Sequence, residues 1–304
     1  MSRILLTGSK GFIGRRLAHE LLKDGNDVLG VDPAAYPDYV PPCTTIKEIT
    51  EDDILRWYPE KIVLCGAIKG LDACRKSAVS FEKNISSLLP YLRYAFSFPT
   101  TQILFVSSDM VFGGMPGGAP YAENCAVKAS NAYGAMKIAG EQLVALIPKH
   151  AIVRTALVYG ALDDEERIRV ADELKEEELG NQTLFYSWLA YQIRTRGRVK
   201  LADNVYSTPT WVMDLVGDIR AILKLDLVGT FHSCGAKKYS RLEMGMNVLA
   251  PLGYADNINV YSARIGLRPL DVSMCSDETR KALDSTHVCP EEVMLPVVRK
   301  EIAL

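Results

Sequence analysis

The stretch Ile4-Leu5-Leu6-Thr7-Gly8-Ser9-Lys10-Gly11-Phe12-Ile13-Gly14 decides the fold, because it joins a short apolar run to a glycine turn. A helical pattern of leucines follows, up to Gly25. Strand, turn and helix therefore come in the order of a dinucleotide-binding unit. Glycines at every third position let the backbone turn tightly and approach a pyrophosphate at the helix N-terminus, where free N–H groups favour an anion. The stretch predicts dinucleotide binding, and the alternative is a tight turn without a ligand.

The next apolar run, residues 27–31, ends in Asp32. An acidic side chain at this point accepts hydrogen bonds from the hydroxyls of the adenosine ribose, which favours NAD(H). A 2′-phosphate would meet this carboxylate, and no arginine follows directly to receive it. Three nearby cations, Lys10, Arg15 and Arg16, leave NADP(H) open. The other interpretation of Asp32 is a loop residue that caps the segment after it.

Three further buried strands are predicted at residues 61–67, 102–106 and 152–160, since continuous apolar runs are typical of parallel sheets. Helical patterns at 84–98 and 133–147 lie between them. This order predicts the α/β class, with a Rossmann-type doubly wound parallel sheet and a smaller C-terminal α/β substrate-binding lobe. We expect a dinucleotide-binding domain at 1–160, with a strand and a helix added from about 199–227. The substrate-binding lobe would occupy mainly residues 161–304.

Composition narrows the class of partner. A formal net charge of -2 provides no basic field for nucleic acid or an anionic membrane. The sequence has neither a signal-peptide pattern nor an apolar run that could cross a bilayer. The seven cysteines are scattered without a Cys-x-x-Cys pair, which predicts a reducing, cytoplasmic location. The four histidines share no ligand spacing, so we expect no metal site. A homodimer is left open.

Tyr133-Gly134-Ala135-Met136-Lys137 places a phenol and an ammonium group four residues apart. On a helix these positions share one face, so the cation would favour the phenolate and lower the pKa of Tyr133. A positively charged nicotinamide ring alongside would add to this effect. Ser108 follows the strand 102–106, at the sheet edge where ligands bind, and its hydroxyl could hold a substrate carbonyl. Tyr-x-x-x-Lys also occurs by chance, and Ser108 could be a turn or capping residue.

Two charged stretches of the second half have open roles. Residues 163–179 carry nine acidic and three basic side chains. We expect either a solvated surface helix, or a lid or partner contact over the substrate cleft. Near the end of the chain, Arg264, Arg268 and Lys281 would clamp a phosphorylated substrate or form ordinary surface salt bridges.

The glycine turn, Ser108, and Tyr133 with Lys137, in this order, resemble an extended short-chain dehydrogenase/reductase. Further stretches are similar to the dTDP-4-dehydrorhamnose reductase family: residues 106–114, 120–123, 131–141, 153–155, 207–215 and 268–269. The likeness runs over most of the chain, and the acidic segment at about 161–182 looks like an insertion. The chain departs from the family in having Ser108-Asp109-Met110 for Thr-Asp-Tyr and Cys65-Gly66-Ala67 for Asn-Ala-Ala.

The resemblance implies an NAD(P)-dependent oxidoreductase that reduces the 4-keto group of a nucleotide-linked 6-deoxy sugar. Tyr133 would protonate the carbonyl oxygen as hydride arrives, Ser108 would hold that oxygen, and Lys137 would bind the nicotinamide ribose. The expected dinucleotide contacts are Gly8, Lys10, Gly11, Phe12, Ile13, Gly14, Asp32, Ala67, Ser107, Tyr133 and Lys137. The expected substrate contacts are Asp109, Met110, Arg154 and Arg268.

Two alternatives to this reductase remain. The first is another reaction on the same scaffold, an epimerase or a dehydrogenase acting on a different sugar or carbonyl substrate. The second is a protein without turnover, because the regulatory β subunit of methionine adenosyltransferase also resembles this family. Such a subunit would keep the glycine turn and bind a dinucleotide.

Overall fold

The computed structural model describes residues 1–33, 43–69, 74–75, 78–114, 117–175, 184–263 and 269–303. Two arginines expected near a substrate, Arg264 and Arg268, lie outside these ranges. So does the end of the acidic segment, residues 176–182. No helix in the described ranges is long and apolar enough to span a membrane.

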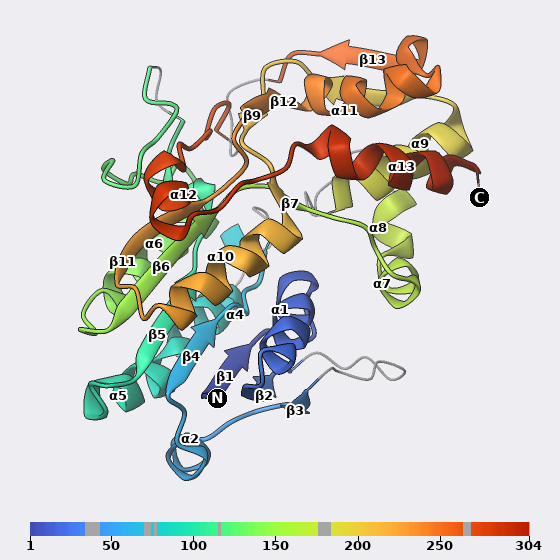
Figure 1. The fold of residues 1–304 in the computed structure, drawn as a ribbon. Helices are drawn as coiled ribbons and strands as arrows, with labels where there is room; N and C mark the ends of the chain where they lie inside the picture. Colours follow the sequence, from blue (N-terminus) through green and yellow to red (C-terminus); the bar gives the residue numbers. More distant parts are fainter. Residues whose placement is uncertain are drawn as a thin grey trace.

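The centre of the fold is a seven-stranded sheet in the order β11-β6-β5-β4-β1-β2-β3 (Figure 1). Its strands are β1 (Arg3–Thr7), β2 (Asp27–Val31), β3 (Thr44–Ile46), β4 (Lys61–Leu64), β5 (Gln102–Val106), β6 (His150–Thr155) and β11 (Gly229–Ser233). All neighbouring pairs are parallel. The strand order reverses between β1 and β4, and ligands bind at the carboxyl ends of such a pair in open α/β sheets. The predicted doubly wound sheet is therefore confirmed.

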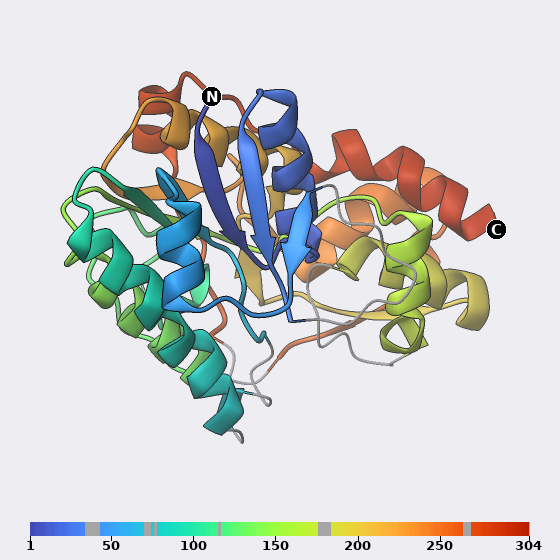
Figure 2. The same cartoon turned by 90° about the horizontal axis from the view of Figure 1, so that it is seen from below.

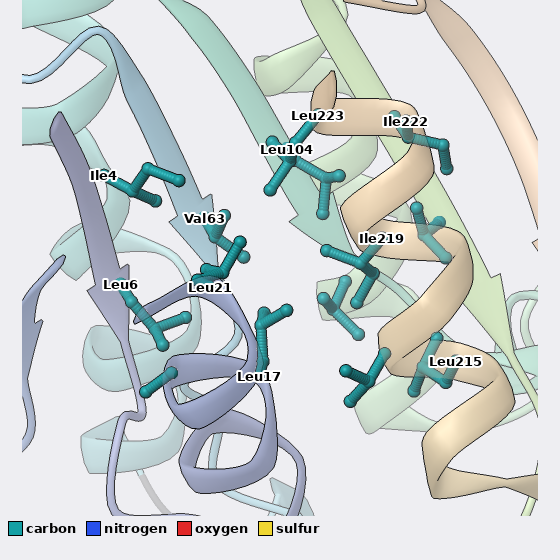
Figure 3. Close-up of a cluster of buried hydrophobic side chains, with 14 of the residues drawn as sticks. Ile4, Leu6, Leu17, Leu21, Val63, Leu104, Leu215, Ile219, Ile222 and Leu223 are labelled. Carbon is teal, nitrogen blue, oxygen red and sulfur yellow. The ribbon is translucent and has the colours of Figure 1, made fainter. Parts of the chain in front are cut away.

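Helices cover both faces of the sheet (Figure 2). One face packs against α1 (Phe12–Lys23) and α10 (Val212–Lys224), and the other against α2 (Glu51–Trp57), α5 (Leu89–Ser97) and α6 (Ala132–Val144). Side chains alternate along a strand, so Ile4 and Leu6 join the α1 and α10 cluster while Leu5 joins the opposite one. Figure 3 shows the first cluster, with Leu17 and Leu21 of α1 facing Leu215 and Ile219 of α10 over the same face of the sheet.

Shorter elements complete the sheet region. The short helix α4 (Ala78–Asn84) leads to the 3-10 turn η1 (Ser86–Leu88) and α5. A second 3-10 turn, η2 (Asp109–Val111), follows β5 directly. It lies at the carboxyl edge of the sheet, next to the start of α6.

The later elements build a second core, which Figure 1 shows grouped at one end of the molecule. Its helices are α9 (Phe185–Arg196), α11 (Arg241–Leu249) and α13 (Pro290–Ala303), with α12 (Asp277–Leu283) packed nearer the sheet. Its short strands are β7 (Val158–Tyr159), β8 (Val199–Ala202), β9 (Tyr206–Ser207), β10 (Thr210–Trp211), β12 (Tyr239–Ser240) and β13 (Ile258–Tyr261). The 3-10 turns η4 (Ala250–Leu252) and η5 (Ala255–Asn257) follow α11.

The chain segment expected to rejoin the sheet differs in part from the prediction. The helix within 199–227 is α10, which covers the sheet as expected. The strands in that range, β8, β9 and β10, pair instead with β13, β12 and β7, and the strand that enters the sheet is β11, after α10. Apolar runs alone do not show which strand pairs with which. The division into two domains stays a prediction.

The acidic segment forms two short helices, α7 (Asp164–Arg169) and α8 (Ala171–Lys175), in place of the single helix expected. Asp163 caps α7, because its side chain accepts from the Glu166 N–H while the Glu166 carboxylate accepts from the Asp163 N–H. Val170 ends α7 with a non-helical backbone. Leu174 of α8 is buried in the second core, whereas Ile168 of α7 is 78% exposed.

Candidate active site

The glycine turn between β1 and α1 packs too tightly for a side chain at Gly8 or Gly14. Gly8 has a φ of +69°, and a Cβ placed on it would lie 2.8 Å from the Cα of Gly66. A Cβ on Gly14 would lie 2.0 Å from the Gly8 carbonyl oxygen. At the N-cap of α1, Gly11 has no side chain to bond the first N–H groups of the helix, which suits them to an anion. This backbone cradle fits the pyrophosphate of a dinucleotide.

Asp32 is fixed to the same cradle. It follows β2, is 7% exposed, and its Oδ2 accepts a hydrogen bond of 2.9 Å from the backbone N–H of Lys10. The carboxylate therefore stands beside the glycine turn, at the position predicted for the adenosine ribose. Around the turn, Phe12, Ile13 and Ala67 are half-buried.

The three residues expected to react are brought together where β5 meets α6. Lys137 of α6 donates to the carbonyl oxygen of Val106 at 2.8 Å, and its Nζ lies 5.8 Å from the centroid of the Tyr133 ring. Ser108 caps η2, and its hydroxyl donates to Asp109 Oδ1 at 2.9 Å. A Cβ on Gly134 would lie 2.0 Å from the Met110 carbonyl oxygen, so glycine between Tyr133 and Lys137 allows α6 to approach η2.

The pKa of Tyr133 moves in the direction opposite to the prediction. Burial raises it above its ordinary value, the carboxylate of Asp109 raises it further, and a hydrogen bond with Ser108 opposes the shift only in part. Burial also lowers the pKa of Lys137 to about 8. The sequence argument considered the nearby cation but not the desolvation of the phenol. In this site the phenol is protonated at neutral pH, as a proton donor must be.

A buried network lies behind Lys137. The Glu141 carboxylate accepts from the Ser107 hydroxyl at 2.6 Å and from Nε and Nη2 of Arg154 at 3.0 and 2.8 Å. Nη1 of Arg154 donates to the Glu123 carbonyl oxygen at 3.1 Å and lies 3.4 Å from His232 Nε2. Arg154, expected to contact a substrate, is thus held inside the protein by its own chain. Glu141 was missed, although it stands on the same helix face as Tyr133 and Lys137, one turn further on.

Two other expected substrate contacts, Asp109 and Met110, also point inward. They are 3% and 8% exposed. Met110 packs with Val272 and Met274, and Asp109 accepts from the Ser207 hydroxyl at 3.4 Å. Both side chains are therefore buried next to Tyr133, and their contact with a substrate stays a prediction. Arg268 lies outside the described residues.

The acidic segment contacts α1, the helix that follows the glycine turn. Arg16 of α1 forms a bidentate pair with Glu166 of α7, with both N–O distances at 2.8 Å. Arg15 lies 2.9 Å from Asp163. Two of the three cations that left NADP(H) open, Arg15 and Arg16, therefore face carboxylates of this segment. Within the described ranges, no group of three or more His, Cys, Asp or Glu side chains is arranged to hold a metal.

Comparisons with known proteins agree with this geometry. The dTDP-4-dehydrorhamnose reductase of Mycobacterium tuberculosis is 26% identical over 257 residues, which cover 83% of this chain and 76% of that protein. The methionine adenosyltransferase 2 subunit beta of Danio rerio is 23% identical over 247 residues, covering 80% and 71%. A solved structure of dTDP-4-dehydrorhamnose reductase from Bacillus anthracis in complex with NADP is 22% identical, with a TM-score of 0.77 over 97% of this chain and 98% of that one.

A family model, the RmlD substrate binding domain, matches residues 1–286. The match includes the glycine cradle, the Tyr133 helix and most of the second core. It confirms the resemblance to dTDP-4-dehydrorhamnose reductases and the expected class, the short-chain dehydrogenase/reductase type of NAD(P)-dependent oxidoreductase. The chain belongs to the RmlD substrate binding domain family.

Proposed function

We propose that this protein is an NAD(P)H-dependent reductase of a nucleotide-activated 4-keto-6-deoxy sugar. The observation that carries the proposal is the meeting of Ser108, Tyr133 and Lys137 at the carboxyl edge of the sheet. The glycine cradle at the end of β1 belongs to the same edge. The curated dTDP-4-dehydrorhamnose reductases among the relatives support the substrate class.

In this mechanism a bound dinucleotide supplies hydride to the carbonyl carbon. Tyr133 donates its phenolic proton to the carbonyl oxygen, and the Ser108 hydroxyl hydrogen-bonds the same oxygen and orients it. The raised pKa keeps the proton on Tyr133 until the substrate oxygen gains charge. The Lys137 ammonium group then favours the phenolate that forms. General acid catalysis of this kind is worth ~10²–10⁴-fold in rate.

We propose NAD(H) as the favoured dinucleotide. Asp32 lies beside the glycine cradle, where its carboxylate accepts from the Lys10 N–H, and a carboxylate at this place would oppose a 2′-phosphate. The Bacillus anthracis relative holds NADP. Both forms of the cofactor therefore belong in the first assay. A cytoplasmic location is part of the proposal, in line with seven cysteines that all remain free thiols.

A regulatory subunit is the second candidate function, favoured by the likeness to methionine adenosyltransferase 2 subunit beta. A protein of that kind would bind the dinucleotide in the glycine cradle without turning it over. The Ser108, Tyr133 and Lys137 set favours the reductase.

The test is a titration with NADH and NADPH followed by a panel of dTDP-linked 4-keto-6-deoxy sugars. Loss of the nicotinamide absorbance band with one member of the panel would support the reductase. Tight dinucleotide binding without oxidation by any member would favour the regulatory candidate. Absence of binding by both dinucleotides would contradict the two functions together.

A further inference from the structure

Residues 163–175, here called the acidic strap, form ion pairs and hydrogen bonds with α1. The guanidinium of Arg16 donates to both carboxylate oxygens of Glu166, and also to the carbonyl oxygens of Phe12 at 2.7 Å and Ala161 at 2.9 Å. Glu166 is 2% exposed. Its carboxylate also completes the capping box of α7. This side chain therefore joins the cap of one helix to the first turns of another.

The neighbouring arginine faces the same helix. Arg15 Nη1 lies 2.9 Å from Asp163 and 3.7 Å from Glu166, and Nη2 lies 3.5 Å from Glu165. Three carboxylates of the strap thus surround two guanidinium groups of α1. The local sum of these charges is negative.

Both arginines lie in the first two turns of α1, close to the glycine cradle in sequence. The backbone N–H of Arg15 makes the first helical hydrogen bond of α1, to Gly11. At a rise of about 1.5 Å per residue, both arginines lie within ~6 Å of the helix start along its axis. With Lys10, they are the cations nearest the cradle in sequence.

The strap is fixed at its other side as well. Arg167 pairs with Glu301 of α13 at 2.6 Å. The carbonyl oxygen of Leu174 in α8 accepts from Gln192 at 3.0 Å, and that of Lys175 accepts from Arg196 at 2.8 Å. These contacts hold α7 and α8 between α1 and the second core, in contrast to a freely solvated helix.

We propose that the acidic strap is a determinant of dinucleotide specificity. Asp163, Glu165 and Glu166 neutralise Arg15 and Arg16 and add negative charge next to the cradle, so that a dinucleotide with a 2′-phosphate is disfavoured relative to NAD(H). The strap acts together with Asp32, and it works by charge over a range of about 10 Å, within which screening by salt is incomplete. This inference rests on the proposed binding of a dinucleotide.

Two variants remove charge while they keep the hydrogen bonds of the capping box. Glu166→Gln retains an oxygen that accepts from Asp163 N–H, and Asp163→Ser retains a hydroxyl that caps α7. Asp172→Asn is the matched control, because Asp172 is an exposed carboxylate of the same strap that pairs with Lys175 of α8. Glu301→Gln loosens the far anchor without changing the three carboxylates near Arg15 and Arg16.

The measurement is the Kd of each protein for NADH and NADPH by fluorescence titration. We expect the ratio of the NADPH Kd to the NADH Kd to fall about three- to tenfold in Glu166→Gln and further in the double variant. The ratio should stay within about twofold of the wild-type value in Asp172→Asn and Glu301→Gln, and the effect should shrink at high salt.

An unchanged ratio in both Glu166→Gln and Asp163→Ser, with Tm values near that of the wild type, would overturn the inference. So would an equal shift in Glu301→Gln, because that result would assign the effect to strap position and not to charge. Failure of the wild-type protein to bind either dinucleotide would instead refute the proposed function.

Discussion

Two arginine–glutamate pairs lie at opposite ends of the candidate site, and they differ in their surroundings. The side chains of Arg154 and Glu141, behind Tyr133, are each 7% exposed; Glu141 also accepts from the Ser107 hydroxyl, and Arg154 Nη1 lies 3.4 Å from His232 Nε2. Arg16 and Glu166, at the dinucleotide end, are 18% and 2% exposed. Both pairs are bidentate. The first is enclosed by protein, whereas the arginine of the second reaches solvent. The comparison suggests a rigid reacting end and an electrostatically adjustable dinucleotide end.

The largest effect is expected for Tyr133→Phe, which separates the two ends. Removing the phenolic proton donor should lower kcat by ~10²–10⁴-fold, since general acid catalysis is lost. The Kd for NADH should stay within about twofold, because the cradle and Asp32 are untouched. Single-turnover kinetics and fluorescence titration measure the two quantities. A parallel loss of dinucleotide affinity would mean that Tyr133 serves mainly to bind the cofactor.

Glu141→Gln should break the enclosed pair. The guanidinium of Arg154 would be left buried without a counter-charge, which typically costs about 3–5 kcal/mol in the free energy of unfolding. Urea denaturation gives this value. The double variant Glu141→Gln with Arg154→Met provides the control, because removal of both charges should restore part of the stability. A decrease in the free energy of unfolding below about 1 kcal/mol would show that water reaches Arg154 in the variant, despite its low exposure in the structure.

The pH dependence of turnover tests the reacting end alone. Because burial lowers the pKa of Lys137 to about 8, the ammonium form is present below that pH and is lost as the pH rises through it. We expect kcat for reduction to fall above pH 8, approaching about tenfold per pH unit as the neutral amine stops favouring the phenolate. In Lys137→Arg the fall in kcat near pH 8 should be absent, because arginine stays charged, even if kcat of this variant is lower at neutral pH. A wild-type profile that is flat to pH 10 would contradict the assignment.

The smallest effect is expected for Glu166→Gln on stability, the counterpart of Glu141→Gln. Arg16 can turn to water once its partner is neutral, so the loss should be about 1 kcal/mol. The same urea titration provides the comparison. If Glu166→Gln lowered the free energy of unfolding as much as Glu141→Gln, the two ion pairs would be equally enclosed by protein, which would contradict the distinction between the two ends.

Much of the sheet region could be predicted from local patterns. Apolar runs and the spacing of Gly8, Gly11 and Gly14 indicated β1, β2, β4 and the cradle, because these signals depend on neighbouring residues. The i, i+4 spacing on α6 correctly placed Lys137 near Tyr133. Such features are determined within one or two elements.

Other features depend on contacts between distant segments and could not be predicted in this way. The pKa of Tyr133 follows its burial, which only the folded chain determines. Arg154 was expected to contact a substrate, but it bonds to Glu141 and lies beside His232, which come from α6 and β11. The strap was expected to be a polar helix. Its ion pairs with Arg15 and Arg16 join residues far apart in the sequence, so local patterns could not show them.

The late position of α10 and β11 in the chain has a consequence for biosynthesis. The six strands up to β6 are complete at Thr155, but α10, which covers one face together with α1, ends only at Lys224. At about 5–20 residues per second, a ribosome would take several seconds to make the intervening segment. During this time Leu104, Val106 and Val153 would lack their cover from α10. A nascent chain of this protein should therefore need a chaperone most strongly between the synthesis of β6 and that of α10.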